Sequence, residues 1–195
     1  MSSREQILAA VKANQPAATA LPSLAGFDMT TPGELSAFRK VVEGLGAILF
    51  EIPDYTAIAP LLREHYPHIE RVIAVDPAYY PVNDQEEWQT TDAHALENVD
   101  MAIIPGQWGV AENGAIWMEE QDMKVRVLPF ICQHLAIVLS KHNLVATMHQ
   151  VYEKIGGPNT GFGVFIAGPS KTADIEQSLV LGAHGAKSLA IFVVG

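Results

Sequence analysis

The chain has 195 residues, 49% hydrophobic and 17% charged, so it is long and apolar enough to fold around a substantial core. Twelve basic residues against 22 acidic ones give a formal net charge of −10, and the scattered lysines and arginines form no basic patch, which excludes a typical nucleic-acid-binding protein. The single cysteine, Cys132, excludes an internal disulfide and a four-thiolate metal site held by this chain alone. No targeting signal or membrane-length apolar run is visible, which predicts a cytoplasmic protein without a membrane span.

Residues 1–33 are predicted to form an N-terminal helix followed by a connection. Ser2 or Ser3 can cap a helix over residues 3–13, in which Ile7, Leu8 and Val11 form one apolar stripe. The following segment, up to Pro32, is rich in Ala, Pro, Ser and Thr, which is typical of an extended or flexible connection. The helix is expected to pack on the domain or on a partner.

From residue 34 to residue 195, short apolar segments alternate with segments of helical periodicity. Helices are predicted at 34–45, 55–66, 144–155 and 172–181, and strands at 47–52, 71–75, 101–104, 114–118, 135–139, 162–167 and 189–194. Uninterrupted apolar strands indicate burial on both faces. The pattern therefore predicts one α/β domain over residues 34–195, with a mostly parallel sheet sandwiched by helices.

One candidate site lies where the strand 162–167 ends and the helix 172–181 is expected to begin. Ligands of open α/β sheets bind beyond the carboxyl ends of strands, and a helix N-terminus favours an anion. Gly168 permits a tight turn, Ser170 and Thr172 offer hydroxyl groups, Lys171 offers positive charge, and Asp174 lies in the first turn. The alternative is an ordinary helix cap without a ligand.

A second candidate site is the glycine-rich segment 106–114. It presents one carboxylate, Glu112, which is a candidate base, nucleophile or ligand, with Asn113 beside it. The alternative is a structural β-hairpin in which Asn113 and Gly114 form a type I′ turn.

The histidines provide further candidates but no metal site. None of their spacings matches a metal-binding helix, so no metal ligand is predicted. His134, ahead of a buried strand, and His184, after the last expected helix, are the better candidates for a functional role. Cys132 lies in an apolar run and is expected to be a buried, inert thiol.

Four segments resemble the lactate-utilisation protein C family, also called the LUD domain. Residues 168–176 read GPSKTADIE and residues 182–185 read GAHG, which together resemble the C-terminal signature of that family. Residues 109–114 read GVAENG and resemble its G-x-A-E-T-G-T stretch, although Asn113 replaces a threonine. Leu128-Pro129 followed by His134 resembles its L-P-x-x-H-I stretch with a longer spacing.

This resemblance implies a fold of the sugar-phosphate isomerase and CoA-transferase type. It also implies a role in oxidising lactate to pyruvate as one subunit of a three-protein system whose other members carry iron–sulfur clusters. In that system the present chain is expected to bind no cofactor itself and to bind a small carboxylate- or phosphate-bearing ligand. Glu112 and His184 would then supply proton transfer or orientation.

Two other functions stay open from the sequence. The residues AENG at 111–114 are similar to the S-E-N-G motif of CoA transferases, in which the glutamate is a nucleophile, so Glu112 is also a candidate nucleophile toward a CoA thioester. The third possibility is a non-catalytic assembly module that docks through the N-terminal helix.

Overall fold

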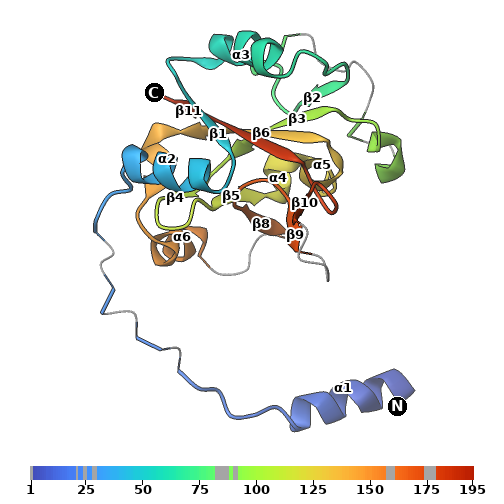
Figure 1. Ribbon diagram of the computed structural model, residues 1–195. Coiled ribbons are helices and arrows are strands. Elements are labelled where there is room, and N and C mark those ends of the chain that lie inside the picture. The colour runs from blue at the N-terminus through green and yellow to red at the C-terminus, as the bar shows by residue number, and fades with distance from the viewer. Residues whose placement is uncertain are drawn as a thin grey trace.

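The computed structural model describes residues 2–20, 22–23, 26–27, 30–81, 88–89, 92–156, 161–173 and 179–195. A five-stranded parallel sheet with the strand order β1-β11-β6-β3-β2 forms its centre (Figure 1). Its strands are β1 (Ile48–Ile52), β2 (Val72–Ala74), β3 (Met101–Gly106), β6 (His134–Ser140) and β11 (Ser188–Val194). All of its pairings are parallel, which confirms the predicted α/β fold with a mostly parallel sheet.

The parallel sheet is covered on both faces, as its apolar strands require. On β3, Met101 and Ile103 belong to a core shared with α3, whereas Ala102 and Ile104 belong to a core shared with α2 and the second sheet. Figure 1 shows the same layering, with α3 on one side and α2, α4 and α5 on the other. The helices are α2 (Leu35–Gly44), α3 (Ile58–His65), α4 (Glu120–Met123), α5 (Leu128–Ile131) and α6 (Met148–Ile155), with short 3-10 helices η1 (Tyr55–Ala57), η2 (Ala93–Leu96) and η3 (Lys141–Asn143).

A second sheet of four strands, which the sequence did not predict as a separate unit, packs beneath the first. Its order is β7-β4-β5-β8, with β4 (Trp108–Val110), β5 (Ile116–Glu119), β7 (Leu144–Val145) and β8 (Gly163–Ile166). The antiparallel pairs β4–β5 and β5–β8 form its centre, and α6 packs on its outer face through Val151.

The helix predicted over residues 144–155 is only partly correct. Leu144 and Val145 pair with β4 as β7, and the helix begins at Met148. The start of the helix at Met148 is fixed by the side chain of Gln150. Its Oε1 accepts the N–H groups of Ala146 (2.7 Å) and Thr147 (3.1 Å), which precede the helix. These two residues therefore stand outside the helix.

The helix predicted over residues 172–181 is wrong. Lys171–Ala173 (β9) and Leu179–Leu181 (β10) form an antiparallel ribbon. Its hydrogen bonding continues past the strands, because the N–H of Ser170 donates to Ala186 O (2.9 Å) and Ser170 O accepts from Gly182 N–H (3.1 Å). The backbone N–H and C=O groups of this segment are therefore satisfied by pairing with a neighbouring segment, and not by hydrogen bonds within a helix.

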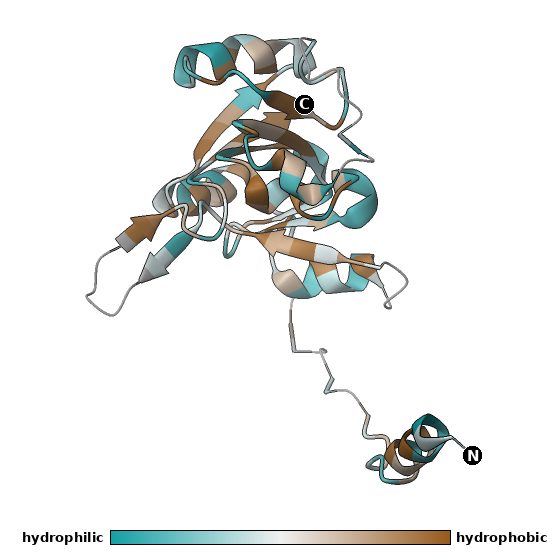
Figure 2. Cartoon of the chain, turned by 90° about the vertical axis from the view of Figure 1, so that its right-hand side faces the viewer, coloured by the Kyte–Doolittle hydropathy of each residue, from teal (hydrophilic) through white to brown (hydrophobic). Residues whose placement is uncertain are grey.

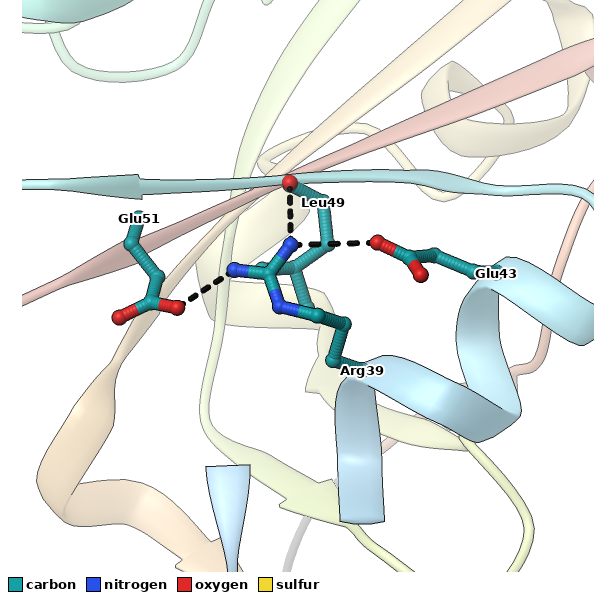
Figure 3. A network of polar contacts seen from close by, with 4 residues as sticks. All are labelled: Arg39, Glu43, Leu49 and Glu51. Carbon is teal, nitrogen blue, oxygen red and sulfur yellow. Dashed lines mark hydrogen bonds and ion pairs between the residues drawn. The ribbon is translucent and has the colours of Figure 1, made fainter. Parts of the chain in front are cut away.

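Arg39 ties α2 to the edge strand β1 (Figure 3). Its guanidinium donates to Leu49 O (3.1 Å), to Glu43 Oε1 (3.1 Å) and to Glu51 Oε1 (2.5 Å). The hydrogen bond to Glu51 is the largest of the interactions that raise the pKa of Arg39. Because these groups are partly exposed, the network fixes geometry more than it adds stability.

The N-terminal helix α1 (Ser3–Ala13) is present as predicted, with Ser2 as its N-cap and Glu5 completing a capping box. None of its residues is buried, and it lies apart from the sheets (Figure 1). Figure 2 shows both hydrophobic and hydrophilic residues on its surface. The connection meets the domain at Pro32, which forms an isolated bridge with Val145.

Candidate functional site

The two parts of the C-terminal motif meet at one cavity of about 230 Å³. Gly168, Pro169 and Ser170 follow β8, while His184, Gly185 and Ala186 precede β11. The structure thus brings together Gly168, Ser170 and His184, all three of which the sequence singled out.

Close backbone packing builds this cavity wall. Gly168 has φ of +76°, and a Cβ at this position would lie 3.0 Å from the Leu45 Cβ, so a larger residue would be strained and crowded. A Cβ at Gly185 would lie 3.3 Å from the Ser170 Cβ. The Ser170 segment can therefore lie close to the His184 segment, and the hydrogen bond from Ser170 N–H to Ala186 O (2.9 Å) joins the two.

The cavity combines an apolar wall with two polar side chains. Apolar residues of α5, β6, β8 and β11 line most of it, including Phe130, Leu135 and Val164. The polar side chains are those of Ser170 and the exposed His184. This arrangement suits a small ligand with an apolar body and one hydrogen-bonding end.

Two other residues of the predicted anion site, Lys171 and Thr172, point elsewhere. The Lys171 ammonium donates to the carbonyl of Leu45, and the Thr172 hydroxyl donates to Val180 O (3.4 Å). Neither residue lines the cavity, and Asp174 lies outside the described residues. Because residues 171–173 are a strand, the cavity has no helix N-terminus of the predicted kind.

Glu112 is placed away from this cavity, at the N-terminus of α6. Its Oε1 accepts the N–H of Met148 (2.6 Å), and its own N–H donates to Ala146 O (3.0 Å). A carboxylate at this position satisfies a free helix donor and interacts favourably with the helix dipole. The geometry gives Glu112 a structural partner, and Glu112 is not among the residues that line the cavity beside His184.

The loop that carries Glu112 is a β-hairpin turn, as the structural alternative predicted. Asn113 Oδ1 accepts the N–H of Ala115 (3.0 Å), and Gly114 N–H donates to Val110 O (2.9 Å). The turn is not type I′, which needs positive φ at two consecutive residues: Gly114 has φ of +72°, but Asn113 has no positive φ.

His134 begins β6 and belongs to a different part of the surface. Its Nδ1 lies 2.6 Å from Ser188 Oγ, and its ring meets that of Tyr66 edge-on at 4.9 Å. Burial lowers the pKa of His134, and the nearby charge of Lys187 lowers it further, against the opposing effect of Asp100. The sequence missed Tyr66, Lys187 and Ser188, because the register of β11 against β6 brings Ser188 and Lys187 to His134 and the end of α3 brings Tyr66 there.

No metal centre is formed by the described part of the chain, where no three His, Cys, Asp or Glu side chains are arranged to hold an ion. Cys132 is buried as expected, and burial raises the pKa of its thiol to about 12. Among the helices in the described ranges, none is long and apolar enough to cross a membrane.

The sequence of the chain is similar to those of lactate-utilisation proteins. A family model described as the LUD domain matches residues 23–194. A Lactate utilization protein C of Geobacillus kaustophilus is 29% identical over 178 residues, which cover 85% of this chain and 70% of that protein. An uncharacterized protein of Neisseria meningitidis serogroup B is 26% identical over 171 residues, covering 85% of this chain and 69% of that protein.

A solved structure shares the fold. The crystal structure of a DUF162 family protein from Deinococcus radiodurans superposes with a TM-score of 0.62, covering 83% of this chain and 96% of that chain. The sequence identity is 16%, so this likeness supports the fold alone.

Proposed function

Because the chain belongs to the LUD-domain family, we propose that it acts in lactate utilisation as a subunit that carries no iron–sulfur cluster of its own. The family resemblance found in the sequence motifs is confirmed by the match to residues 23–194. The similar proteins named Lactate utilization protein C support the pathway. The single cysteine supports a division of labour in which partner proteins hold the clusters and transfer the electrons.

The cavity between Ser170 and His184 is the proposed ligand site of this subunit. The observation that supports it is the meeting of two motif segments, from either side of the β9–β10 ribbon, at one cavity of about 230 Å³. A small carboxylate would place its polar end at the Ser170 hydroxyl and the His184 imidazole, and its apolar part against Phe130 and Val164.

Anaerobic purification of the tagged chain from its native cells grown on lactate tests the subunit role. We expect an eluate with iron–sulfur absorbance and lactate-oxidising activity. A colourless, inactive eluate that contains only this chain, from cells whose growth on lactate survives deletion of the gene, would contradict the proposal.

Variants of the cavity test the ligand site separately. Ser170→Ala and His184→Gln should impair growth on lactate but not on glucose, while the purified variants keep their melting temperature. His94→Gln is the matched control, because His94 is a highly exposed histidine in η2 outside this cavity. Normal growth of both cavity variants on lactate would remove the proposed site.

The N-terminal helix supports a second candidate, an assembly module. The side chains of Ile7, Leu8 and Val11 are all more than half exposed, although they form one apolar stripe. Deletion of residues 1–20 should then abolish capture of the partners without a change in thermal stability. Retention of the partners by the shortened chain would show that the helix is not the docking element.

A further inference from the structure

A second cavity, of about 280 Å³, lies at the edge of the parallel sheet where β3, β6 and β11 begin. Asp100 precedes β3, His134 opens β6 and Lys187 precedes β11, and all three residues line the cavity. The register pairs Met101 with His134 and His134 with Ser188, so the three strand starts lie side by side. The segment after α3, around Tyr66 and His68, supplies the remaining wall.

Backbone hydrogen bonds fix the floor of this cavity. The N–H of His134 donates to Asp100 O (2.8 Å), and the N–H of Lys187 donates to Gln133 O (2.9 Å). Each of these bonds joins the start of one strand to the start of its neighbour. The side chains of Asp100, His134 and Lys187 therefore stand on a rigid base.

A side-chain network orients the imidazole of His134. Ser188 Oγ lies 2.6 Å from His134 Nδ1 and donates its proton to Tyr66 Oη at 3.3 Å. Nδ1 is thereby occupied, so Nε2 is the nitrogen left to interact with a ligand.

The lining of the cavity balances one cationic and one anionic side chain, Lys187 and Asp100, and it becomes cationic when its histidines are protonated. Lys187 carries positive charge, and the three lining histidines, His65, His68 and His134, add positive charge when they are protonated. Asp100 is the one acidic side chain among the lining residues, and its Oδ2 already accepts the N–H groups of Glu70 (2.8 Å) and Arg71 (2.9 Å).

We propose that this second cavity binds a small anion, a carboxylate or a phosphate, between the ammonium of Lys187 and the imidazole of His134. The site goes beyond the proposed function and does not rest on it, because it shares no lining residue with the cavity at Ser170 and His184. An anion there would offset the Lys187 charge that acts on His134.

Binding at this site is therefore linked to proton uptake. Burial and Lys187 hold the pKa of His134 below its usual value, and a bound anion would raise it. The affinity should increase as the pH falls from about 7.5 to about 6. The other titratable side chains that line the cavity are those of His65, Tyr66, His68, Asp100 and Lys187, and the Asp100 carboxylate opposes the anion.

Nuclear magnetic resonance of the histidine rings in the full chain tests the proposal. Sodium acetate and sodium phosphate are titrated separately, each against sodium chloride at the same ionic strength, so that the two sources of anion are distinguished. We expect a saturable shift of the His134 signal with one of them and a dissociation constant of about 1 mM. Equal shifts with chloride, or shifts that do not saturate, would overturn the proposal.

Three variants complete the test. Lys187→Met should weaken binding at least about fivefold, and Lys187→Arg should retain it because the charge remains. The Lys187 side chain is exposed, so both variants are expected to fold. His184→Gln, in the first cavity, should leave the affinity unchanged; a loss in this variant, or undiminished binding in Lys187→Met, would show that the anion binds elsewhere.

Discussion

The carboxylate of Glu112 is expected to stabilise the N-terminus of α6, and replacing it tests this role. Glu112→Ala removes the acceptor of the Met148 N–H, which lies 2.6 Å from Oε1. Glu112→Gln keeps an acceptor oxygen and removes only the charge. The free energy of unfolding should therefore decrease in the order wild type, Glu112→Gln, Glu112→Ala.

The size of the loss follows from two contributions. A lost capping hydrogen bond costs about 1 kcal/mol, and the loss of a negative charge beside a helix N-terminus costs about 0.5 kcal/mol. Glu112→Ala should therefore lose about 1.5 kcal/mol, which lowers the melting temperature by about 3–6 °C in a chain of this size. Glu112→Gln should lose about 0.5 kcal/mol.

Urea unfolding followed by circular dichroism measures these differences, and Glu153→Ala is the matched control. Glu153 is an exposed carboxylate in the last turn of the same helix, where its charge opposes the dipole, so its removal should be neutral or slightly stabilising. Equal stability of Glu112→Ala and wild type would refute the capping role.

The same variants separate structure from chemistry at this position. If the role of Glu112 is to stabilise the N-terminus of α6, Glu112→Gln supports growth on lactate almost as well as wild type. Loss of growth at near wild-type stability would instead identify the carboxylate as a reacting group. Incubation with an acyl-CoA and hydroxylamine would then reveal whether it forms a thioester-derived intermediate, through inactivation and a mass change at Glu112.

Three further predictions concern the cores and the two cavities. Cys132 should resist alkylation at pH 8 in the folded chain and react on unfolding in urea, because burial raises its pKa to about 12; rapid labelling of the native chain would contradict this. The lowered pKa of His134 means that the unfolded chain binds more protons, so the free energy of unfolding should fall as the pH drops from about 7 to about 5.5. This fall should be smaller in His134→Asn. If urea unfolding gives the same dependence on pH for the variant and the wild type, His134 is not its cause. Gly168→Ala should lose about 1–2 kcal/mol in urea unfolding because of its positive φ and the Leu45 contact, whereas Gly44→Ala, exposed in a helix with open space around it, should lose nothing.

Local signals in the sequence were sufficient for most of the fold. The apolar runs at β6 and β11 identified buried parallel strands, since a strand covered on both faces shows no alternation. The capping box of α1 and the periodicity of α2 and α3 identified these helices. The C-terminal motif singled out Gly168, Ser170 and His184 as candidates, and the fold brings these three residues to one cavity.

Tertiary pairing decided what the local pattern could not. Residues 171–173 have no strong strand signal of their own, and they form β9 because residues 179–181 pair with them. Leu144 and Val145 likewise become β7 because β4 offers a free edge, although their residue types also suit a helix. A second sheet therefore arises where the sequence suggested a helix and isolated strands.

The chemistry of the individual residues was readable from the sequence, but their partners were not. Residue types alone marked Glu112 and His134 as candidates. Only the fold brings the Glu112 carboxylate to the N–H of Met148 at the N-terminus of α6. Only the parallel register of β6 and β11 brings Ser188 and Lys187 next to His134. The physical reason is that these contacts join segments separated by 36 and 54 residues, and local sequence pattern carries no information about such distant pairings.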